Sequence, residues 1–199
     1  MNIVVLGPQG SGKGTQAERI KATYGIPHVA TGDMLREMRE LDTPVALELR
    51  AVLDRGDLVD DALMIDLIRE RLSRGDTVGG FVLDGFPRTM PQAEALDDLL
   101  RELGRDLDVV FDFRVPDRDV VLRRLLARAA DEGRSDDTPE AIQRRLELYD
   151  RETAPLVEYY RSTRGNVVGV HADRTVDEVF REIEDALAEA VRHGKAPVR

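Results

Sequence analysis

The sequence predicts an α/β fold in which helices cover both faces of a parallel β-sheet. Short apolar stretches alternate with helical stretches along the 199-residue chain, an order that is typical of parallel sheets. A glycine-rich loop, "GPQGSGKG", joins the first of these apolar stretches to the first helical one. No internal repeat, low-complexity segment or long linker interrupts the sequence, so we expect one domain over residues 1–199.

The elements expected in the first half follow from apolar runs and from the positions of glycine and proline. The run "NIVVL" ends at a glycine-rich turn and predicts a buried strand, whereas Pro44 and Gly56 mark the start and the end of a helix. In chain order the pattern predicts a strand at 2–6, a helix at about 14–24, two short helices within 31–41 and 44–56, an amphipathic helix within 60–75, a strand at 81–83 and a helix within 90–103. Because the two short helices interrupt the alternation, we expect them to form an insertion that stands off the core.

The elements expected in the second half continue the alternation. In chain order they are a strand within 108–115, a helix within 117–129, a break at 131–137, a long helix within 138–162, a strand at 166–170 and a helix within 175–191. Pro155 lies inside the long helix, where we expect a kink because proline lacks the N–H group that the helix requires.

Composition and charge exclude several classes of function. The net charge of −10 argues against a nucleic-acid-binding surface, which requires a basic face. No apolar run approaches the length of a membrane span, and the start "MNIVVLG" lacks the features of a signal peptide, so we expect a cytoplasmic protein with no membrane contact. The sequence contains no cysteine, which rules out disulfides and zinc bound by cysteine.

The first loop nearly matches the phosphate-binding pattern G-x-x-x-x-G-K-[ST]. Gly7, Gly12 and Lys13 fit the pattern, but Gly14 stands where a hydroxyl is expected and Thr15 follows one position late. Glycines let the backbone direct several N–H groups at one anion, and Lys13 would reach the β- and γ-phosphates. The alternative is a glycine-rich turn that binds nothing. The position of the loop between a strand and a helix favours the P-loop interpretation.

The missing hydroxyl changes how a magnesium ion would be bound. In common P-loop enzymes the Ser or Thr after the lysine coordinates Mg²⁺ directly, which Gly14 cannot do. Mg²⁺ readily keeps water ligands, so phosphates and waters can hold it. Asp84, after the second apolar run, is the expected partner of those waters. An Asp at such a position can also be only a turn or cap residue.

Several arginines follow expected strands or lie on helices near them. A guanidinium suits phosphate because it donates two parallel N–H groups. Taken singly, any of these arginines could be a surface residue, but a group of them facing one cleft would repel each other unless anions were bound there. The candidates are Arg36, Arg88, Arg124, Arg128, Arg134 and Arg145.

Together these segments resemble the adenylate kinases, within the nucleoside monophosphate kinases. The matching segments are "GPQGSGKGTQ", "TGDMLR", "GDLV", "DGFPRTMPQA", "GRSDD" and "RRLELYDRETAPLVEYY". The loop of this family reads "GKGT", so the resemblance implies that the late hydroxyl belongs to an enzyme whose acceptor is a second nucleotide. It further implies a P-loop three-layer sandwich with a five-stranded parallel sheet, a monophosphate-binding subregion at 30–59, a short lid at 128–134 and a monomer without zinc.

The resemblance also assigns roles to individual positions. ATP would contact Gly10, Ser11, Gly12, Lys13, Gly14, Thr15, Arg128 and Arg174. AMP would contact Thr31, Arg36, Leu58, Val59, Gly85, Phe86, Pro87, Arg88, Gln92, Arg134 and Arg145. The catalytic group would be Lys13, Arg88, Arg124, Arg128, Arg134 and Arg145, with Asp84 bound to Mg²⁺ through water. The alternatives are purely structural roles: Thr31 only starts a helix, Pro87 is a turn residue and Gln92 lies on a helix surface.

The implied reaction is the reversible, Mg²⁺-dependent conversion of ATP and AMP into two ADP. The AMP phosphate is already largely ionised near neutral pH, because its second pKa is ~6, so no general base is required. We therefore expect His28, His171 and His193 to be structural or exposed.

Two other functions remain open. One is a UMP/CMP kinase, although Thr31 and Gln92 favour adenine in this family and the pyrimidine relatives usually have "GFPRN" where this chain has "GFPRT". The other is a non-catalytic nucleotide-sensing module, which would be favoured by loss of Lys13, Arg88 or the lid arginines, and all of these are present. A GTPase is disfavoured because the sequence contains no N-K-x-D motif.

Overall fold

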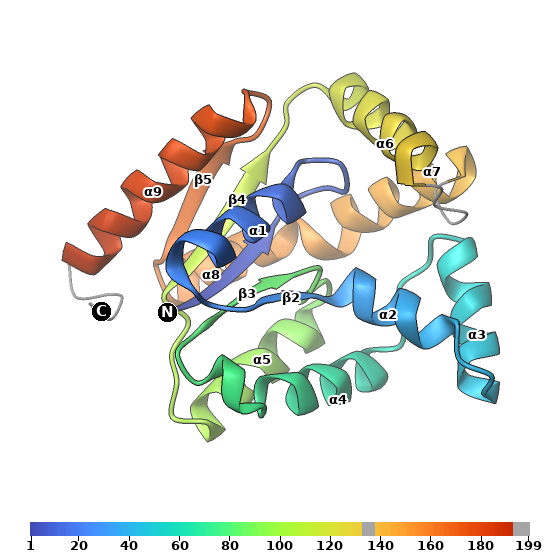
Figure 1. Cartoon of the computed structure of the whole chain (residues 1–199), viewed down its shortest axis with the longest axis horizontal. Helices are drawn as coiled ribbons and strands as arrows, with labels where there is room; N and C mark the ends of the chain where they lie inside the picture. The colour runs from blue at the N-terminus through green and yellow to red at the C-terminus, as the bar shows by residue number, and fades with distance from the viewer. Residues whose placement is uncertain (133–137, 193–199) are drawn as a thin grey trace.

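The computed structural model has the predicted α/β fold and describes residues 1–132 and 138–192 (Figure 1). Five strands form one sheet in the order β2-β3-β1-β4-β5, and every neighbouring pair is parallel. Their bounds are β1 Asn2–Leu6, β2 His28–Ala30, β3 Phe81–Asp84, β4 Val109–Arg114 and β5 Val167–His171. All five strands therefore end at the same edge of the sheet, where ligands of such folds usually bind.

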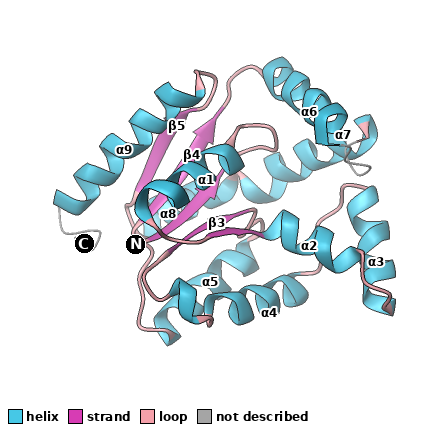
Figure 2. Ribbon diagram, viewed as in Figure 1, coloured by secondary structure: helices cyan, strands magenta, loops and turns pink. Residues whose placement is uncertain are grey.

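Helices cover the sheet on both faces, as Figure 2 shows. Their bounds are α1 Lys13–Tyr24, α2 Thr31–Arg39, α3 Pro44–Asp54, α4 Asp61–Leu72, α5 Met90–Glu102, α6 Arg118–Glu132, α7 Pro139–Leu148, α8 Pro155–Thr163 and α9 Val176–Arg192, with a 3₁₀ turn η1 at Gly75–Thr77 and a π-helical turn η2 at Tyr149–Thr153. Over residues 1–132 and 138–192, none of the helices is long and apolar enough to span a bilayer.

The central strand β1 explains how both helical layers are attached. All five of its residues are buried, and successive side chains point to opposite faces of the sheet. Ile3 and Val5 belong to the core cluster that α1 and α9 cover. Val4 and Leu6 belong to the cluster that α4, α5 and α8 cover. A strand buried on both faces has few polar positions, which is why Asn2, whose side chain donates to the carbonyl of Asp106 at 2.7 Å, is followed by a continuous apolar run.

The helices α2 and α3 follow the edge strand β2 and lie beside each other at one end of the sheet (Figure 1). Leu35 of α2 and Leu49 of α3 reach the core cluster under α4 and α5. A separate small cluster joins α6 to α7 through Leu125, Ile142 and Leu146. These two helix pairs flank the carboxyl edge of the sheet, where the candidate site lies.

The edge strand β2 is the element that the sequence pattern does not predict. It has only three residues, His28–Ala30, of which Val29 alone is a buried apolar residue. It pairs with β3 and has no second neighbour in the sheet. A strand of this length contains too few residues for an apolar period to be detected.

The helix expected over 138–162 is divided into α7, the turn η2 and α8. Pro155 is the first residue of α8, and the amide of Ala154 donates to the carbonyl of Tyr149, five residues earlier, at 2.8 Å. Proline has no N–H to continue the α-helical ladder, and a widened turn before it accommodates its ring. The irregularity predicted at Pro155 is therefore spread over the preceding five residues, which lie against the candidate site. The break predicted at 131–137 is wrong at residues 131 and 132, which continue α6, and its remaining positions, 133–137, lie outside the described residues.

Candidate functional site

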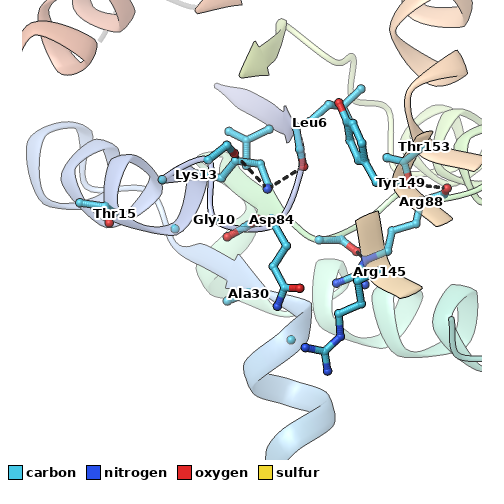
Figure 3. Close-up of a pocket in the computed structure, with 18 of the residues that line it drawn as sticks. Leu6, Gly10, Lys13, Thr15, Ala30, Asp84, Arg88, Arg145, Tyr149 and Thr153 are labelled. Carbon is cyan, nitrogen blue, oxygen red and sulfur yellow. Dashed lines mark hydrogen bonds between the residues drawn. The ribbon is translucent and has the colours of Figure 1, made fainter. Parts of the chain in front are cut away.

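A cleft of about 750 Å³ opens where β1 and β3 end. The loop between β1 and α1 forms one wall, and the segment after β3 forms the opposite one (Figure 3). Residues from α2, α6 and α7 complete the lining. The cleft therefore lies between the central sheet and both pairs of flanking helices.

The loop after β1 encloses a lysine. Lys13 Nζ donates to the carbonyl oxygens of Gly7 at 2.7 Å and Pro8 at 2.8 Å, and it lies 3.4 Å from Ser11 Oγ. Figure 3 shows the ammonium group inside the curve of the backbone. A positive charge is thus fixed at the N-terminus of α1, where the helix dipole also favours an anion.

Glycine is required in this loop because the backbone is close to a neighbouring helix. Gly10 has φ +80°, and a Cβ there would lie 2.9 Å from Leu125 Cγ and 3.0 Å from the carbonyl oxygen of Val121. Both neighbours belong to α6, so the loop and that helix are in direct contact.

Asp84, the last residue of β3, lies beside this loop. Burial by itself raises the pKa of Asp84, but the contact with His28 and the positive charges of Lys13 and Arg88 bring that pKa below its ordinary value. The carboxylate is therefore ionised at neutral pH. A Cβ on Gly14 would lie 3.4 Å from Asp84 Oδ2, so the absence of a side chain there keeps the carboxylate open to the loop.

His28 connects Asp84 to α1. Its Nδ1 lies 2.8 Å from Glu18 Oε1 and its Nε2 lies 3.5 Å from Asp84 Oδ2, with only 6% of the side chain exposed. Burial lowers the pKa of His28, but the two carboxylates raise it by more, so the pKa lies above its ordinary value. His28 is thus structural, as the sequence analysis expects, and it bridges two elements of the site.

This bridge predicts how stability depends on pH. In the folded protein the pKa of His28 is above 6.5, the ordinary value for a histidine side chain. The stabilisation that the two carboxylates give through His28 is therefore complete below pH 6.5, and it is lost as pH rises through the folded-state pKa. We expect the parent to have a higher free energy of unfolding than His28→Gln, by a margin that shrinks above neutral pH. Urea titrations at several pH values measure this margin, with exposed His171→Gln as the control. A margin that is constant with pH would contradict the account.

Arg88 is held in place by three hydrogen bonds after the end of β3. Its amide donates to Gln92 Oε1 at 2.8 Å, and its Nε donates to the carbonyl of Gly85 at 2.7 Å. Its carbonyl accepts from Thr153 Oγ1 of the turn η2 at 2.8 Å. Two of these bonds use the main-chain N–H and C=O of Arg88 itself, so the path of the turn does not depend on the guanidinium.

Three guanidinium groups approach one another at this wall of the cleft. Burial lowers the pKa of Arg88, and the positive charges of Arg145 and Arg36 lower it further, whereas Asp84 raises it. Figure 3 shows Arg88 and Arg145 on the same side of the cleft. An anion bound between these groups would remove their mutual repulsion, which makes this a candidate phosphate site.

The arginines around the cleft also contact neighbouring segments. Arg36 forms an ion pair with Asp33 within α2, and Arg145 Nη2 donates to the carbonyl of Leu53 in α3 at 3.1 Å. Arg124 Nη1 donates to the carbonyl of Ala172 at 2.8 Å. These contacts join α6 and α7 to the segments they face across the cleft.

Most of the predicted site residues line this cleft. They are Gly10, Ser11, Gly12, Lys13, Gly14, Thr15, Arg36, Leu58, Val59, Asp84, Gly85, Pro87, Arg88, Gln92, Arg124, Arg145 and Arg174. Phe86 is buried in the core instead. Arg128 lies in α6, but its side chain is outside the described part of the structure, and Arg134 is outside the described residues altogether.

Thr31 lies behind the wall of the cleft. Its side chain is buried, and its hydroxyl donates to the carbonyl of Asp84 at 3.1 Å. Gly85 has φ +84°, and a Cβ there would lie 2.4 Å from Thr31 Oγ1. Thr31 therefore supports the backbone turn that carries Arg88, and its predicted contact with a base stays a prediction.

Three residues at or behind the wall of the cleft were not singled out from the sequence. Tyr149 and Thr153 belong to the turn η2 and line the cleft, and burial raises the pKa of the Tyr149 hydroxyl. Asp61 contacts Gln92 from behind the wall. The sequence gives no signal for Tyr149 and Thr153, because no sequence pattern predicts a π-helical turn. The pair Asp60-Asp61 predicts the start of a helix, and this interpretation gives no reason to expect a further role for Asp61.

Known proteins resemble this sequence over nearly its whole length. A family model described as adenylate kinase matches residues 5–165. A protein named adenylate kinase from Xylella fastidiosa (strain 9a5c) is 47% identical over 187 residues, which cover 94% of this chain and 99% of that protein. Another adenylate kinase, from Xanthomonas euvesicatoria pv. vesicatoria (strain 85-10), is 43% identical with the same coverage.

Proposed function

The chain belongs to the adenylate kinase family, and from this premise we propose how the residues of its cleft transfer a phosphoryl group. The protein is a nucleoside monophosphate kinase that converts ATP and AMP into two ADP. The observation that carries the proposal is the convergence of Lys13 and Arg88 on Asp84 at the ends of two adjacent strands. The transferring phosphoryl group passes between these two cations.

We assign the ATP phosphates to the loop after β1. Its backbone from Gly10 to Thr15, together with Lys13, offers N–H groups and a positive charge at a helix N-terminus. Arg174 lines the same end of the cleft, which supports a contact with ATP. The assignment of Arg128 to ATP, and of Arg134 to the closing lid at 128–134, rests on the sequence resemblance.

We assign AMP to the opposite wall, with the subregion 30–59 as its binding part. The charges of Arg36 and Arg145 both act on Arg88, and all three residues line the cleft, which supports a bound monophosphate at this wall. Leu58 and Val59 line the cleft next to them and offer an apolar surface to the base. Gln92, which also lines this wall, is the group that contacts the adenine edge.

Mg²⁺ fits this site through Asp84. The carboxylate is ionised, and Gly14 leaves space between it and the loop that we assign to ATP. Among the described residues no group of three acidic or histidine side chains forms a metal cage, so phosphates and waters would supply the remaining ligands. When bound, the ion neutralises charge on the ATP phosphates.

Transfer then depends on alignment and charge. An oxygen of the AMP phosphate attacks the terminal phosphorus of ATP, and the bond from that phosphorus to the ADP oxygen breaks on the opposite side. The attacking oxygen is already ionised, so no residue has to accept a proton. Lys13 and Arg88 stabilise the charge on the phosphoryl group during transfer, and Arg124 and Arg145 complete the set of cations. Closure of the flanking helices excludes water, which would otherwise hydrolyse ATP.

The acceptor assignment predicts the behaviour of Gln92→Ala. Loss of the amide removes hydrogen bonds to adenine, so we expect the KM for AMP to rise about 10-fold and the KM for ATP to stay within about twofold. A coupled assay measures both values, and exposed Gln143→Ala on α7 is the control. The parent should strongly prefer AMP over CMP, UMP and GMP. Equal turnover of UMP by the parent would contradict the adenine assignment and favour a UMP/CMP kinase.

We also propose that the enzyme acts as a monomer in the cytoplasm. The acidic net charge and the absence of a membrane-spanning helix among the described residues are compatible with this. Sedimentation equilibrium tests the oligomeric state, and a mass twice that of one chain would contradict it.

A further inference from the structure

We propose that Asp61 determines the base specificity of the acceptor site by fixing the orientation of the Gln92 side-chain amide. The inference rests on the proposed function, in which Gln92 contacts the acceptor base. Asp61 does not line the cleft, so it acts through Gln92 as a positioning residue. The argument depends on the chemical nature of the two groups that hold the amide.

Gln92 is held at both ends of its amide. Its Nε2 donates to Asp61 Oδ1 at 2.7 Å, and its Oε1 accepts from the amide of Arg88 at 2.8 Å. Gln92 as a whole residue is only 2% exposed, so water cannot replace these partners freely. A carboxylate only accepts hydrogen bonds and a backbone N–H only donates, so the two contacts specify which end is oxygen and which is nitrogen.

Asp61 is available for this task because another residue caps its helix. Asp60 Oδ1 accepts from the amides of Ala62 at 3.0 Å and Leu63 at 3.2 Å, which satisfies the N-terminus of α4. Asp61 Oδ1 also accepts from Thr89 Oγ1 at 2.9 Å. The carboxylate is therefore oriented by a hydroxyl of the turn before α5, and not by its own helix.

The amide orientation selects between bases. After its two internal contacts, the Gln92 amide retains one acceptor position on Oε1 and one N–H on Nε2. Adenine offers a donor at its 6-amino group and an acceptor at N1, which match this pair. Hypoxanthine offers an acceptor at O6 and a donor at N1, which require the amide to be reversed.

Reversal of the amide is opposed by both partners. The oxygen of Gln92 would face the Asp61 carboxylate, and its NH₂ group would face the amide N–H of Arg88. Two buried contacts between like groups replace two hydrogen bonds, so a 6-oxo base is rejected even though its shape is nearly that of adenine. Without the carboxylate, only the Arg88 amide opposes reversal.

The test compares AMP with inosine monophosphate (IMP), which differs at the 6-position and at N1. Asp61→Asn keeps the shape of the side chain but offers either a donor or an acceptor to Gln92. We expect the ratio of kcat/KM for AMP to kcat/KM for IMP to fall about 10-fold, since AMP binds more weakly and IMP more tightly. The KM for ATP should not change. An unchanged ratio in a folded Asp61→Asn protein would overturn the proposal.

Two further variants separate this role from a structural one. Asp60→Ala removes the neighbouring cap and should lower stability without changing the AMP to IMP ratio. A similar change of the ratio in Asp60→Ala would show a general effect of loosening α4 and would overturn the proposal. If Asp61→Asn does not fold, Asp61→Ser takes its place, because a hydroxyl can also donate or accept. We expect the same fall in the AMP to IMP ratio, and an unchanged ratio in Asp61→Ser would overturn the proposal.

The failure of this inference can be distinguished from failure of the proposed function. If Gln92→Ala raises the KM for AMP while Asp61→Asn and Asp61→Ser leave the ratio unchanged, only the role of Asp61 is wrong. If Gln92→Ala leaves the KM for AMP unchanged, Gln92 does not contact the base. In that case the assignment of Gln92 to the acceptor base and the role of Asp61 are both wrong.

Discussion

Replacement of Arg88 by alanine is expected to lower kcat about 100- to 1000-fold, because preorganised charges of this kind are worth that much in other enzymes. Arg88 is half-buried in the wall of the cleft, and its Nε is fixed by the carbonyl of Gly85, so it needs no reorganisation when charge develops on the phosphoryl group. The alanine variant should remain folded, since the amide and the carbonyl of residue 88 keep their bonds to Gln92 and Thr153. Steady-state kinetics with saturating ATP and AMP measure the effect.

Two controls define the meaning of the Arg88 result. Arg101→Ala removes an exposed arginine that pairs with Asp98 on α5, and its kcat should match that of the parent. Arg88→Lys keeps a positive charge but loses the planar fork, so it should recover only part of the activity. Near-normal turnover in a folded Arg88→Ala protein would show that the charge at this wall does not act on the transferring group.

Replacement of Lys13 by methionine is expected to cause a loss of kcat of the same order, about 100- to 1000-fold. Methionine preserves most of the length of the side chain and removes the charge. Lys13 also donates to the carbonyls of Gly7 and Pro8, so the variant frees two acceptors that water must satisfy. The same kinetic assay measures kcat, and circular dichroism verifies the fold.

The Lys13 variant has a second expected effect, on Asp84. The charge of Lys13 lowers the pKa of that carboxyl, so its removal should raise the pKa of Asp84. Lys21→Met is the matched control, because Lys21 lies on the same helix and pairs with Glu18 at the surface. Full activity in Lys13→Met, with the parental fold, would exclude the loop as the site of phosphoryl transfer.

Four of the five strands could be predicted from the sequence because their residues are largely apolar. The strands β1, β3 and β4 lie inside the sheet and are mostly buried, whereas β5 is a half-buried edge strand that its valines still mark. The edge strand β2 could not, because three residues carry no period and its position depends on pairing with β3. A kink was predicted at Pro155, but the π-helical turn before it, which contacts the turn at Arg88 through Thr153, was not, because no sequence pattern marks such a turn.

The site was predictable where local geometry is dictated by local sequence. The loop around Lys13 and the turn around Arg88 each fold from consecutive residues, so their motifs predict where the charges lie. His28 and Asp61 were not predicted to support the site, because their roles arise from contacts with residues 56 and 31 positions away, Asp84 and Gln92. Such contacts between helices and strands exist only in the folded chain.

The central claim is that one cleft binds both nucleotides, with their phosphates between Lys13 and Arg88. Calorimetric titration with two adenosines joined by five phosphates tests it most directly, because this compound fills both positions at once. We predict one molecule bound per chain, about 100-fold or more tighter than ATP alone, with affinity lost in Lys13→Met and in Arg88→Ala but kept in Arg101→Ala. Binding of two molecules per chain, or an affinity equal to that of ATP, would contradict the account.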